Sequence, residues 1–358
     1  KLCKKMIIIG NNTYDNKNLR KLWKEFLKLR DFKTIDYTDM IYLPVIKNLD
    51  IHLKPSYLMV DECQDLSYFQ HKFLDKIIQQ PTLKKWICAG DSRQSIYSFA
   101  GAMSNSFDMF LEKENVVQKD LDICYRCSLN ILDNANNVYN VLKPFKDEEG
   151  IVDDIESLSE VKPESLVICR NQEPLIEAYF ELVSMKKDCY IKGDDILKPL
   201  IRFLKSYNYD TVSYVITDVN TKVKRLKDKF DSGKINDSET IEYYTLKKNL
   251  KILKVINGNL NISYVKDLIT TLNSFFEVKE NCITLCTIHK SKGLQADVVY
   301  IISEDLIPNP LATSPEQLIQ EENLRYVART RAISELYYYK MPGYGNKKNT
   351  KTEDLQLF

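Results

Sequence analysis

The stretch Tyr57–Asp65, with the sequence YLMVDECQD, decides the expected fold because four apolar residues run directly into two adjacent carboxylates. A continuous apolar run is typical of a strand that is buried on both faces of a parallel sheet. Ligands of open α/β sheets bind at the carboxyl ends of the strands, so Asp61 and Glu62 are candidate site residues. On these residues alone, a surface turn after a core strand remains an alternative.

Length and composition indicate a globular protein. With 358 residues and about 150 residues per domain, the chain should hold two or three domains. Lys+Arg 51 and Asp+Glu 50 nearly balance, so nucleic-acid binding has to depend on local basic patches. No apolar run approaches the ~20 residues of a membrane span, and no signal-peptide pattern is present. We therefore expect a soluble intracellular protein without a membrane partner, and the nine scattered cysteines agree with a reducing compartment.

A second apolar segment, Trp86–Ala89, follows a helix that is expected over about Tyr68–Gln79. It ends in the polar loop Gly90–Ala102, with the sequence GDSRQSIYSFAGA, which we expect beside the acidic end of the first strand. Taken together, VDECQD and GDSRQSIYSFAGA resemble motifs II and III of the UvrD/Rep-type superfamily 1 DNA helicases.

Three further segments resemble the remaining motifs of this family in their usual order. Leu121–Ser128, LDICYRCS, resembles motif IV; Ile283–Asp297, ITLCTIHKSKGLQAD, resembles motif V; and Glu321–Ala332, EENLRYVARTRA, resembles motif VI. The resemblance implies an α/β fold with RecA-like parallel-sheet domains of the P-loop NTPase type. The first of these domains would be incomplete, and the second would carry a small helical insertion.

The resemblance also implies a domain organisation. We expect residues 1–119 to form the C-terminal part of RecA-like domain 1A, with motifs II and III. Residues 120–207 and 279–342 would form the two parts of domain 2A, with motif IV in the first part and motifs V and VI in the second. Residues 208–278 would be a helical insertion resembling domain 2B, and residues 343–358 a polar tail.

Local hydrophobic patterns predict additional elements. Met6–Ile9 is expected as a strand and about Asn18–Arg30 as an amphipathic helix. Leu129–Val141 is expected as a helix, and Val141–Lys162 as an acidic loop. Lysine and arginine side chains crowd residues 222–229, which we interpret as a solvated helix face, with a DNA or partner contact as the alternative.

Hydrolysis of a nucleoside triphosphate needs a carboxylate for Mg²⁺ and a group that orients the attacking water. Asp61 suits the metal, and Glu62 suits the role of base or water-positioner. The resemblance implies that Gln94 senses the γ-phosphate and that Arg126 and Arg331 place positive charge on the transferring phosphoryl group. Such an arginine can accelerate hydrolysis by ~10³ to 10⁵. The implied cofactors are ATP and Mg²⁺, and the alternative for each arginine is a solvated surface charge.

Other matched positions imply nucleotide contacts. Tyr125 resembles the tyrosine that stacks on adenine, and Lys292 with Gly293 resembles the part of motif V near the phosphates. Gln295 stands where the family usually has a glutamate that accepts from the ribose; an amide can still accept, so nucleotide binding would only weaken.

Aromatic side chains imply contacts with single-stranded DNA or a single-strand/double-strand junction, since a stacked base contributes ~1 to 3 kcal/mol. Tyr97 and Phe99 match the family's stacking aromatics, with a place in the core as their alternative. Thr287 and His289 match DNA-side positions of motif V, although a histidine alone is more often a packed residue. Ala100 replaces an arginine that is usual in the family, which removes one expected DNA contact.

The motif G-x-x-x-x-G-K-[ST], which cradles phosphates, does not occur in the sequence. The nearest candidate, Gly233-Lys234, is followed by Ile235 and has Asp228 at the first glycine position. We expect a P-loop segment to be supplied in cis, by a native chain that extends upstream of Lys1, or in trans by another chain. Without it, we expect this polypeptide not to hydrolyse ATP at a useful rate.

Two functions remain from this sequence. One is the C-terminal portion of an ATP-dependent 3′-5′ DNA helicase that moves on single-stranded DNA, with replication, repair or viral partners. The other is a helicase-like binding or scaffold module without catalysis. No metal-binding carboxylate cluster beyond Asp61 and Glu62 supports a nuclease. The pairs Cys124/Cys127 and Cys282/Cys286 have zinc-like spacing, but the intervening Tyr125 and Arg126 have better explanations in motif IV.

Overall fold

The computed structural model describes residues 35–193, 196–207, 209–275, 277, 280–310 and 312–344, without the side chains of Phe99 and Asp237. The strand expected at Met6–Ile9 and the helix expected at Asn18–Arg30 lie outside these residues. The chain divides into two compact units, Lys1–Leu121 (unit 1) and Asp122–Phe358 (unit 2). Among the described residues, no helix has the length and apolar character that crossing a membrane requires.

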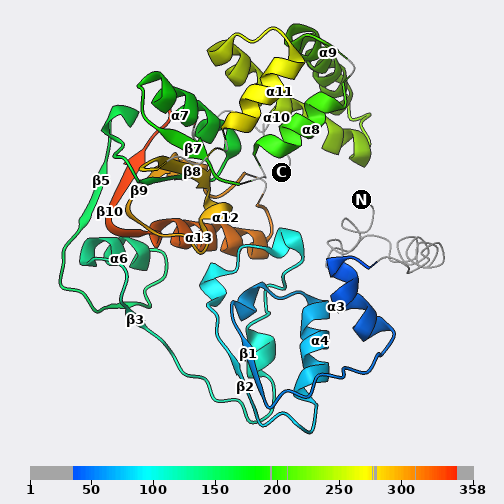
Figure 1. The fold of residues 1–358 in the computed structure, drawn as a ribbon, viewed down its shortest axis with the longest axis vertical. Helices are drawn as coiled ribbons and strands as arrows, with labels where there is room; N and C mark the ends of the chain where they lie inside the picture. Colours follow the sequence, from blue (N-terminus) through cyan, green and yellow to red (C-terminus); the bar gives the residue numbers. More distant parts are fainter. Residues whose placement is uncertain are drawn as a thin grey trace. The chain divides into compact units, whose positions relative to one another are not determined.

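Unit 1 contains a two-stranded parallel sheet and its flanking helices (Figure 1). Among the described residues of unit 1, the α-helices and strands are α3 (Tyr37–Ile46), β1 (Tyr57–Val60), α4 (Tyr68–Ile78), β2 (Lys85–Cys88) and α5 (Asp108–Leu111). A capping box between Ser67 and Gln70 starts α4, as the sequence pattern allows. The helix packs on α3 through Tyr42 and Phe69, whose ring centroids are 4.7 Å apart.

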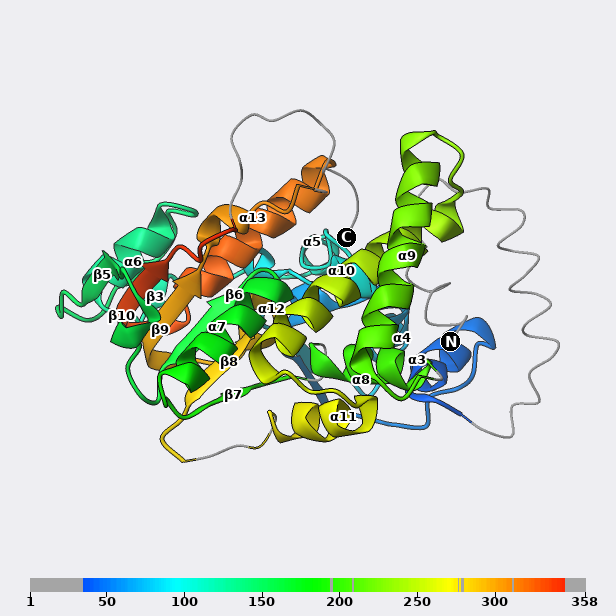
Figure 2. The ribbon, with the colours of Figure 1, turned by 90° about the horizontal axis from the view of Figure 1, so that it is seen from above.

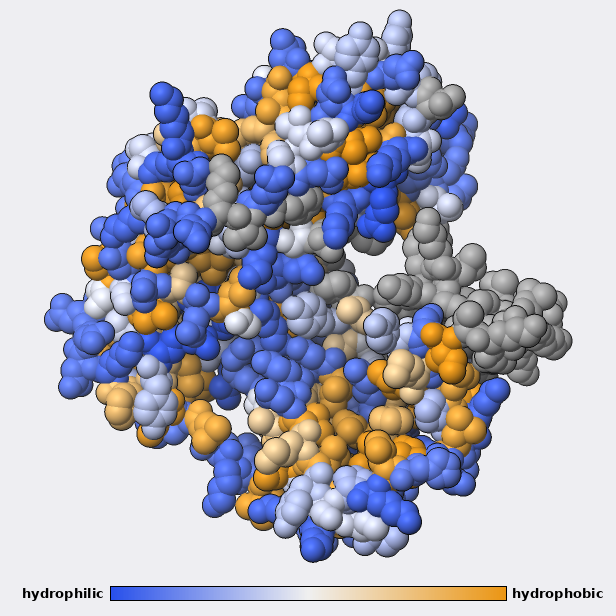
Figure 3. Space-filling view, viewed as in Figure 1, coloured by the Kyte–Doolittle hydropathy of each residue, from blue (hydrophilic) through white to orange (hydrophobic). Residues whose placement is uncertain are grey.

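The strand β1 is exposed on one face, which corrects the prediction that it is buried on both. Its residues alternate between exposed and half-buried, and Tyr57 and Met59 are 67% and 77% exposed. The strand has a single described neighbour, β2, whose Ile87 is also exposed. Figure 3 shows apolar residues at the surface of the part of unit 1 that holds β1 and α4. The apolar sequence therefore identified a strand correctly, but its burial depends on the layers packed against it.

Unit 2 is built on a six-stranded parallel sheet with the order β5-β10-β9-β6-β8-β7. The strands of the sheet are β5 (Ile151–Asp154), β6 (Leu166–Cys169), β7 (Cys189–Ile191), β8 (Ile283–Thr287), β9 (Ala296–Ile302) and β10 (Ala332–Tyr339). A separate ribbon pairs β3 (Ile123–Cys124) with β4 (Lys143–Pro144). These parallel strands, connected through helices, give the α/β architecture of a RecA-like domain.

Helices cover both faces of the unit 2 sheet. Helix α7 (Gln172–Ser184) lies on one face, and α6 (Leu129–Asn136) and α13 (Pro315–Arg329) lie on the other (Figures 1 and 2). The short helix α12 (Ile288–Ser291) contacts both β6 and α13. Because the sheet is covered twice, every residue of β6 is buried, as a continuous apolar run predicts.

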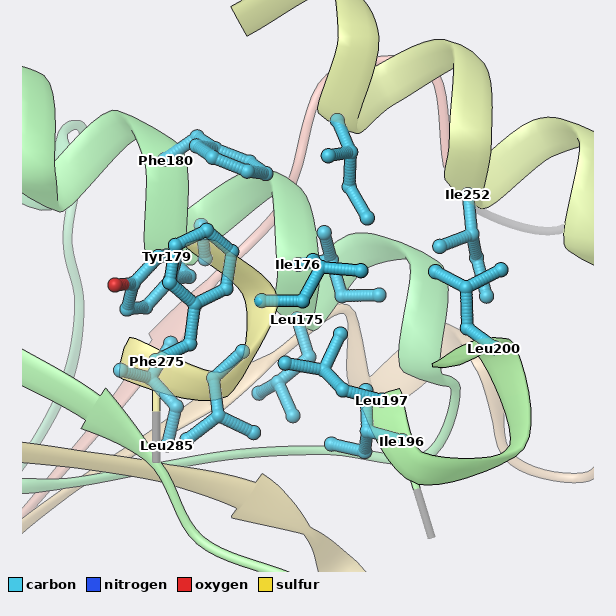
Figure 4. Packing of buried hydrophobic residues seen from close by; sticks show 14 of the residues in the cluster. Leu175, Ile176, Tyr179, Phe180, Ile196, Leu197, Leu200, Ile252, Phe275 and Leu285 are labelled. Atoms are coloured by element: carbon cyan, nitrogen blue, oxygen red, sulfur yellow. The ribbon is translucent and has the colours of Figure 1, made fainter. Parts of the chain in front are cut away.

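Four helices follow β7 and share a core with the sheet. They are α8 (Leu197–Lys205), α9 (Val212–Asp231), α10 (Asp237–Leu260) and α11 (Val265–Ser274). Figure 4 shows Ile196, Leu200 and Ile252 from this region in one hydrophobic cluster with Leu175 of α7 and Leu285 of β8. The rings of Tyr179 and Phe275 lie 4.7 Å apart in the same cluster. The helical region is therefore joined to the sheet by one continuous hydrophobic core.

Two local predictions differ from the structure. Helix α6 ends at Asn136 rather than near Val141, because the Asn136 side chain accepts from the backbone N–H of Leu142 and donates to its carbonyl. The acidic segment expected to be a loop contains β5, which pairs with β10 at the edge of the sheet. Acidic residues are compatible with an edge strand because one of its sides faces solvent.

Candidate functional site

The strand β1 ends in the two predicted catalytic carboxylates, and both are exposed. The Asp61 Oδ1 accepts from the backbone N–H of Glu62 at 2.8 Å. Glu62 itself has φ 50° and ψ 40°, a left-handed conformation that costs a non-glycine residue about 1 kcal/mol or more. The two carboxylates have different partners, since the Asp61 carboxylate accepts from a backbone N–H and the Glu62 carboxylate accepts from the Gln64 amide. Asp61 offers exposed carboxylate oxygens of the kind that Mg²⁺ prefers, so it fits the implied metal.

A chain of hydrogen bonds connects Glu62 to Gln94. The Gln64 Nε2 donates to the Glu62 carboxylate at 2.5 Å, and the Gln64 Oε1 accepts from the backbone N–H of Asp91 at 3.1 Å. The Asp91 carboxylate then accepts from the Gln94 Nε2 at 3.1 Å. Gln64 is 1% exposed, so its amide is fixed in place by burial. The predicted base and the predicted phosphate sensor are therefore joined through two residues that the sequence reasoning did not select.

Close packing holds this chain of hydrogen bonds, which we call the Gln64 relay (Glu62, Gln64, Asp91 and Gln94). A Cβ atom on Gly90 would lie 2.5 Å from the Gln64 Oε1 and 2.8 Å from the Cys63 Sγ, so only glycine fits. On the other side, the Ser106 hydroxyl donates to the Cys63 carbonyl at 2.6 Å and contacts the buried His71 ring at 2.7 Å. Close contacts with Gly90 and Cys63 therefore hold the Gln64 side chain in position.

The predicted DNA-stacking aromatics follow the relay. Tyr97 is half-buried, whereas the preceding Ile96 is 1% exposed and belongs to the core. The prediction for Phe99 concerns a side chain that lies outside the described part of the structure. Ala100, where the family usually has arginine, is exposed.

In unit 2, the ribbon of β3 and β4 positions Tyr125 and Arg126. Tyr125 is 62% exposed, and its ring packs against the 63% exposed ring of Phe145 with centroids 4.5 Å apart. The register explains the pairing, since the Phe145 N–H donates to the Cys124 carbonyl at 3.1 Å. Arg126 is also exposed and donates from Nη1 to the Thr330 carbonyl at 3.1 Å. Sequence reasoning missed Phe145, since its partner is twenty residues away in the chain.

Arg331 has a different environment. It is 2% exposed, and its guanidinium donates to the Val327 carbonyl at 2.9 Å, the Leu294 carbonyl at 3.1 Å and the Thr330 hydroxyl at 3.1 Å. The structure therefore places Arg331 inside unit 2, where it fixes the end of motif V against the end of α13.

The loop Lys292–Gln295 leads to the amino-terminal end of β9. Lys292 is half-buried, whereas Gly293 and Gln295 are exposed. Gly293 has φ 81°, in the region that favours glycine, so the sharp return of the chain depends on it. The Ala296 N–H donates to the Arg331 carbonyl at 3.1 Å. The predicted nucleotide residues of motifs IV, V and VI therefore meet where β9 and β10 begin, which we call the amino edge.

Thr287 and His289 lie at the other end of the sheet, which we call the carboxyl edge. Thr287 ends β8 and is in register with Cys169 of β6, which pairs in turn with Ile302 at the end of β9. Thr287 is 4% exposed. Burial, and to a smaller extent the charge of Arg170, lowers the pKa of His289 to about 3, so the imidazole is neutral at physiological pH.

A buried ion pair supports the carboxyl edge. The Arg170 guanidinium, which follows β6, makes bonds of 2.7 to 3.2 Å to both carboxylate oxygens of Glu321 in α13. Glu321 is 5% exposed and also accepts from the Asn309 N–H at 2.9 Å. Sequence reasoning included Glu321 in motif VI but gave it no role, because its partner lies 151 residues away.

Among the described residues, no group of three or more histidine, cysteine, aspartate or glutamate side chains is placed to hold a metal ion. The Cys127 N–H donates to the Cys124 Sγ at 3.5 Å, so these two residues form a tight turn around Tyr125 and Arg126. The cysteine pair thus has a structural role within motif IV.

Comparisons with known proteins agree with this arrangement. The model of the UvrD/REP helicase N-terminal domain matches residues 3–115, and that of the UvrD-like helicase C-terminal domain matches residues 206–341. The first match contains the Gln64 relay, and the second contains the strands β8, β9 and β10 together with Thr287, His289 and Arg331. The chain belongs to the UvrD/Rep-type superfamily 1 DNA helicases.

Relatives of this helicase chain include several bacterial proteins. ATP-dependent DNA helicase Rep of Buchnera aphidicola subsp. Schizaphis graminum is 24% identical over 457 residues, covering 90% of this chain and 69% of the relative. Gabija protein GajB of Bacillus cereus is 22% identical over 346 residues, covering 86% and 68%. ATP-dependent DNA helicase PcrA of Leuconostoc citreum is 40% identical over 65 residues, covering 17% and 9%. The UvrD/Rep-type chain thus spans about two thirds of the first two relatives.

Proposed function

We propose that this chain is the C-terminal portion of an ATP-dependent 3′-5′ DNA helicase, and that it couples ATP hydrolysis to movement on single-stranded DNA. In this proposal, Asp61 holds Mg²⁺, Glu62 positions the attacking water, and Gln94 senses the γ-phosphate. Arg126 and Arg331 act on the phosphoryl charge. A P-loop segment, in cis or in trans, supplies the remaining phosphate contacts.

The Gln64 relay is the observation that carries this proposal. It joins the Glu62 carboxylate to the Gln94 amide by hydrogen bonds of 2.5 to 3.1 Å through a buried glutamine. An ordinary surface turn does not require such a chain of hydrogen bonds, because water can bind its exposed polar groups. A hydrolysis site benefits from it, since the base and the sensor must keep one geometry while the phosphate changes.

The two edges of the unit 2 sheet give further support. Tyr125, Arg126 and Gln295 lie with Arg331 at the amino edge, whereas Thr287 and His289 lie at the carboxyl edge. Nucleotide and DNA contacts would then occupy separate ends of one rigid sheet. Such a separation suits a motor, because each ligand can be released while the other stays bound.

The test is ATP turnover by the protein at its native length, with and without single-stranded DNA. Glu62→Gln should lower the DNA-stimulated rate by about 10² to 10⁴, as expected for loss of a general base. Glu114→Gln, at an exposed glutamate outside the relay, is the matched control. Displacement of a strand from duplexes with a 3′ or a 5′ tail tests the direction. Equal turnover of Glu62→Gln and the unmodified protein would refute the proposal.

The structure of motif VI favours one alternative, a helicase-like binding module without catalysis. The Arg331 guanidinium is buried and held by three protein acceptors, which is the environment of a structural arginine. In a module of this kind, the affinity for single-stranded DNA would be the same with ADP, with a non-hydrolysable ATP analogue and without nucleotide. A change of affinity between these states would exclude the module.

A further inference from the structure

A shallow hollow of about 500 Å³ lies at the junction of α8 and α9. It is lined by six residues, Phe203, Ser206, Tyr207, Tyr209, Asp218 and Lys222. None of the helicase motifs includes them. We call this feature, together with the adjoining Tyr214, the tyrosine hollow; α8 and α9 are labelled in Figure 2.

The aromatic rings of the tyrosine hollow form a row. The rings of Tyr207 and Tyr209 are stacked, with centroids 6.0 Å apart and planes 27° apart. Tyr214 continues the row 6.4 Å from Tyr209, at 31°. Tyr209 is 42% exposed and Tyr214 is 65% exposed, so a large part of each side chain is accessible from solvent. Nearly parallel exposed rings offer flat apolar faces to a planar aromatic ligand.

Basic residues outnumber acidic ones along the two helices that carry the row. The Lys222 Nζ lies 4.8 Å from the centroid of the Tyr207 ring. Residues 198–231 contain eight lysine or arginine residues against four aspartates, although the whole chain is nearly neutral. Of these, Lys205 directly precedes Ser206 in the hollow, and Arg202 lies one helical turn earlier. The combination of aromatic faces and a basic surround is typical of sites that bind single-stranded nucleic acid.

Within the hollow, a carboxylate indicates which part of the ligand enters. The Lys222 ammonium is held by the Asp218 carboxylate at 2.8 Å and by the Tyr207 hydroxyl at 3.5 Å. Asp218 neutralises Lys222 and would repel a phosphate placed beside it. A base has no charge, and its amino groups can donate to a carboxylate. The chemistry therefore favours a base in the hollow, with the phosphates along the lysines and arginines outside it.

We propose that the tyrosine hollow binds unpaired bases of single-stranded nucleic acid by stacking on Tyr209 and Tyr214. This inference rests on the proposed function for the identity of the ligand, and it adds a contact on the helical region that lies outside the recognised motifs. Stacking requires no particular base, so the site binds most sequences, as a motor that moves along a strand requires.

The experiment measures the affinity of the native-length protein for a fluorescent oligothymidylate, for the same strand with abasic sites, and for the matching RNA. Tyr209→Ala and Tyr214→Ala should each weaken binding of the thymidylate by about 5- to 100-fold. Tyr37→Ala, at a 90% exposed tyrosine of unit 1, is the control that should leave binding unchanged. Thermal unfolding of each variant verifies that the fold is intact.

The abasic strand separates stacking from charge. The unmodified protein should bind the abasic strand more weakly than the normal strand, and the double variant Tyr209→Ala/Tyr214→Ala should discriminate less between the two strands than the unmodified protein does. Photo-crosslinking with 5-iododeoxyuridine should yield peptides that contain Tyr209 or Tyr214. A stronger effect of the variants on RNA than on DNA would identify RNA as the ligand of the same site.

The outcomes distinguish the hollow from the proposed function. If the protein binds single-stranded DNA but the tyrosine variants and the abasic strand leave the Kd unchanged, base binding by the tyrosine hollow is refuted. The helicase proposal then stands. If the unmodified protein binds neither single-stranded DNA nor RNA at low salt, both proposals are refuted. Crosslinks confined to other peptides would also refute the hollow.

Discussion

The strands β1 and β6 have similar apolar sequences, YLMV and LVIC, yet they end in different environments. Met59 at the centre of β1 is 77% exposed, whereas Ile168 at the centre of β6 is fully buried. β1 has β2 as its described partner, while β6 lies between β8 and β9 and is covered by helices on both faces. An apolar run therefore specifies a strand, but the number of neighbouring layers determines its burial.

The same contrast extends to the candidate site residues. In unit 1, Asp61 and Glu62 are exposed at the end of a small sheet and are ordered by polar side chains. In unit 2, Arg331 is enclosed by the structure that it positions. Unit 1 thus holds residues whose loss should affect chemistry alone, whereas unit 2 contains at least one whose loss should affect both chemistry and folding.

The first prediction compares the stability of variants at Arg331 and at Glu62. Arg331→Ala should lower the free energy of unfolding by about 3 kcal/mol, because buried carbonyl groups of Val327 and Leu294 lose their donor. Glu62→Gln should change it by less than about 0.5 kcal/mol, as usual for an exposed site. Urea unfolding measures both values. Equal stabilities for the two variants would contradict the contrast between the units.

The buried core of unit 2 gives an effect of similar size. Ile168→Ala should lower the free energy of unfolding by about 2 to 5 kcal/mol, because it leaves a cavity among fully buried side chains. Met59→Ala removes a comparable number of atoms from an exposed position, so it should cost less than about 0.5 kcal/mol. A large loss for Met59→Ala would show that its face is covered in the native protein.

The Gln64 relay can be disturbed without changing any of its members. Gly90→Ala places a Cβ atom 2.5 Å from the Gln64 Oε1, so the relay must shift. We expect kcat for ATP to fall by about tenfold, which corresponds to the loss of roughly one hydrogen bond. Gly258→Ala is the matched control, because nothing lies within 4 Å of its added Cβ and the residue is inside α10. It should stabilise the fold by about 0.5 to 1 kcal/mol and leave the rate unchanged.

The last effect concerns the pH dependence of stability that His289 and His71 cause. Burial lowers the pKa of His289 in unit 2 to about 3, and burial also lowers the pKa of His71 in unit 1. The unfolded chain takes up a proton near pH 6.5 and the folded chain does not. Stability from these groups is therefore complete above about pH 6.5 and falls below it, for His289 until about pH 3. The free energy of unfolding should change with pH by at most about 1.4 kcal/mol per pH unit because of His289.

His289→Asn should reduce this slope in unfolding experiments between pH 7 and pH 5. His71→Asn should do the same from unit 1, where the ring is held by Ser106. An unchanged slope for His289→Asn would mean that the imidazole takes up its proton at the same pH in the folded protein as in the unfolded chain.

Much of the fold could be predicted from the sequence, because hydrophobic periodicity and helix signals act locally. The strands β1 and β2 and the helix α4 were predicted within one or two residues of their ends. Burial of β1 was predicted wrongly, since it depends on layers that no local pattern describes. β5 was missed because its acidic residues are those of an edge strand.

The candidate site was predicted only in part, and the reason is distance along the chain. Motif residues such as Glu62, Gln94 and Arg331 could be selected from their flanking sequences. Their roles remain predictions, but their surroundings are now described. The partners that hold them could not be selected, because Gln64 bonds to Asp91 and Arg170 bonds to Glu321 across many intervening residues. Pairs of this kind are created by the fold and have no local signal.

The strands β9 and β10 run from the amino edge to the carboxyl edge of unit 2. Ala296 to Ile302 spans about 20 Å at the usual rise of a strand, and the residues in the second half of β9 are fully buried. A close-packed interior has low compressibility, so this sheet moves as a rigid body. A displacement of the amino edge, where Arg331 lies, would therefore move the carboxyl edge, where Thr287 and His289 lie, by the same amount. In the proposed function, the nucleotide and DNA sites of unit 2 would then move as one body.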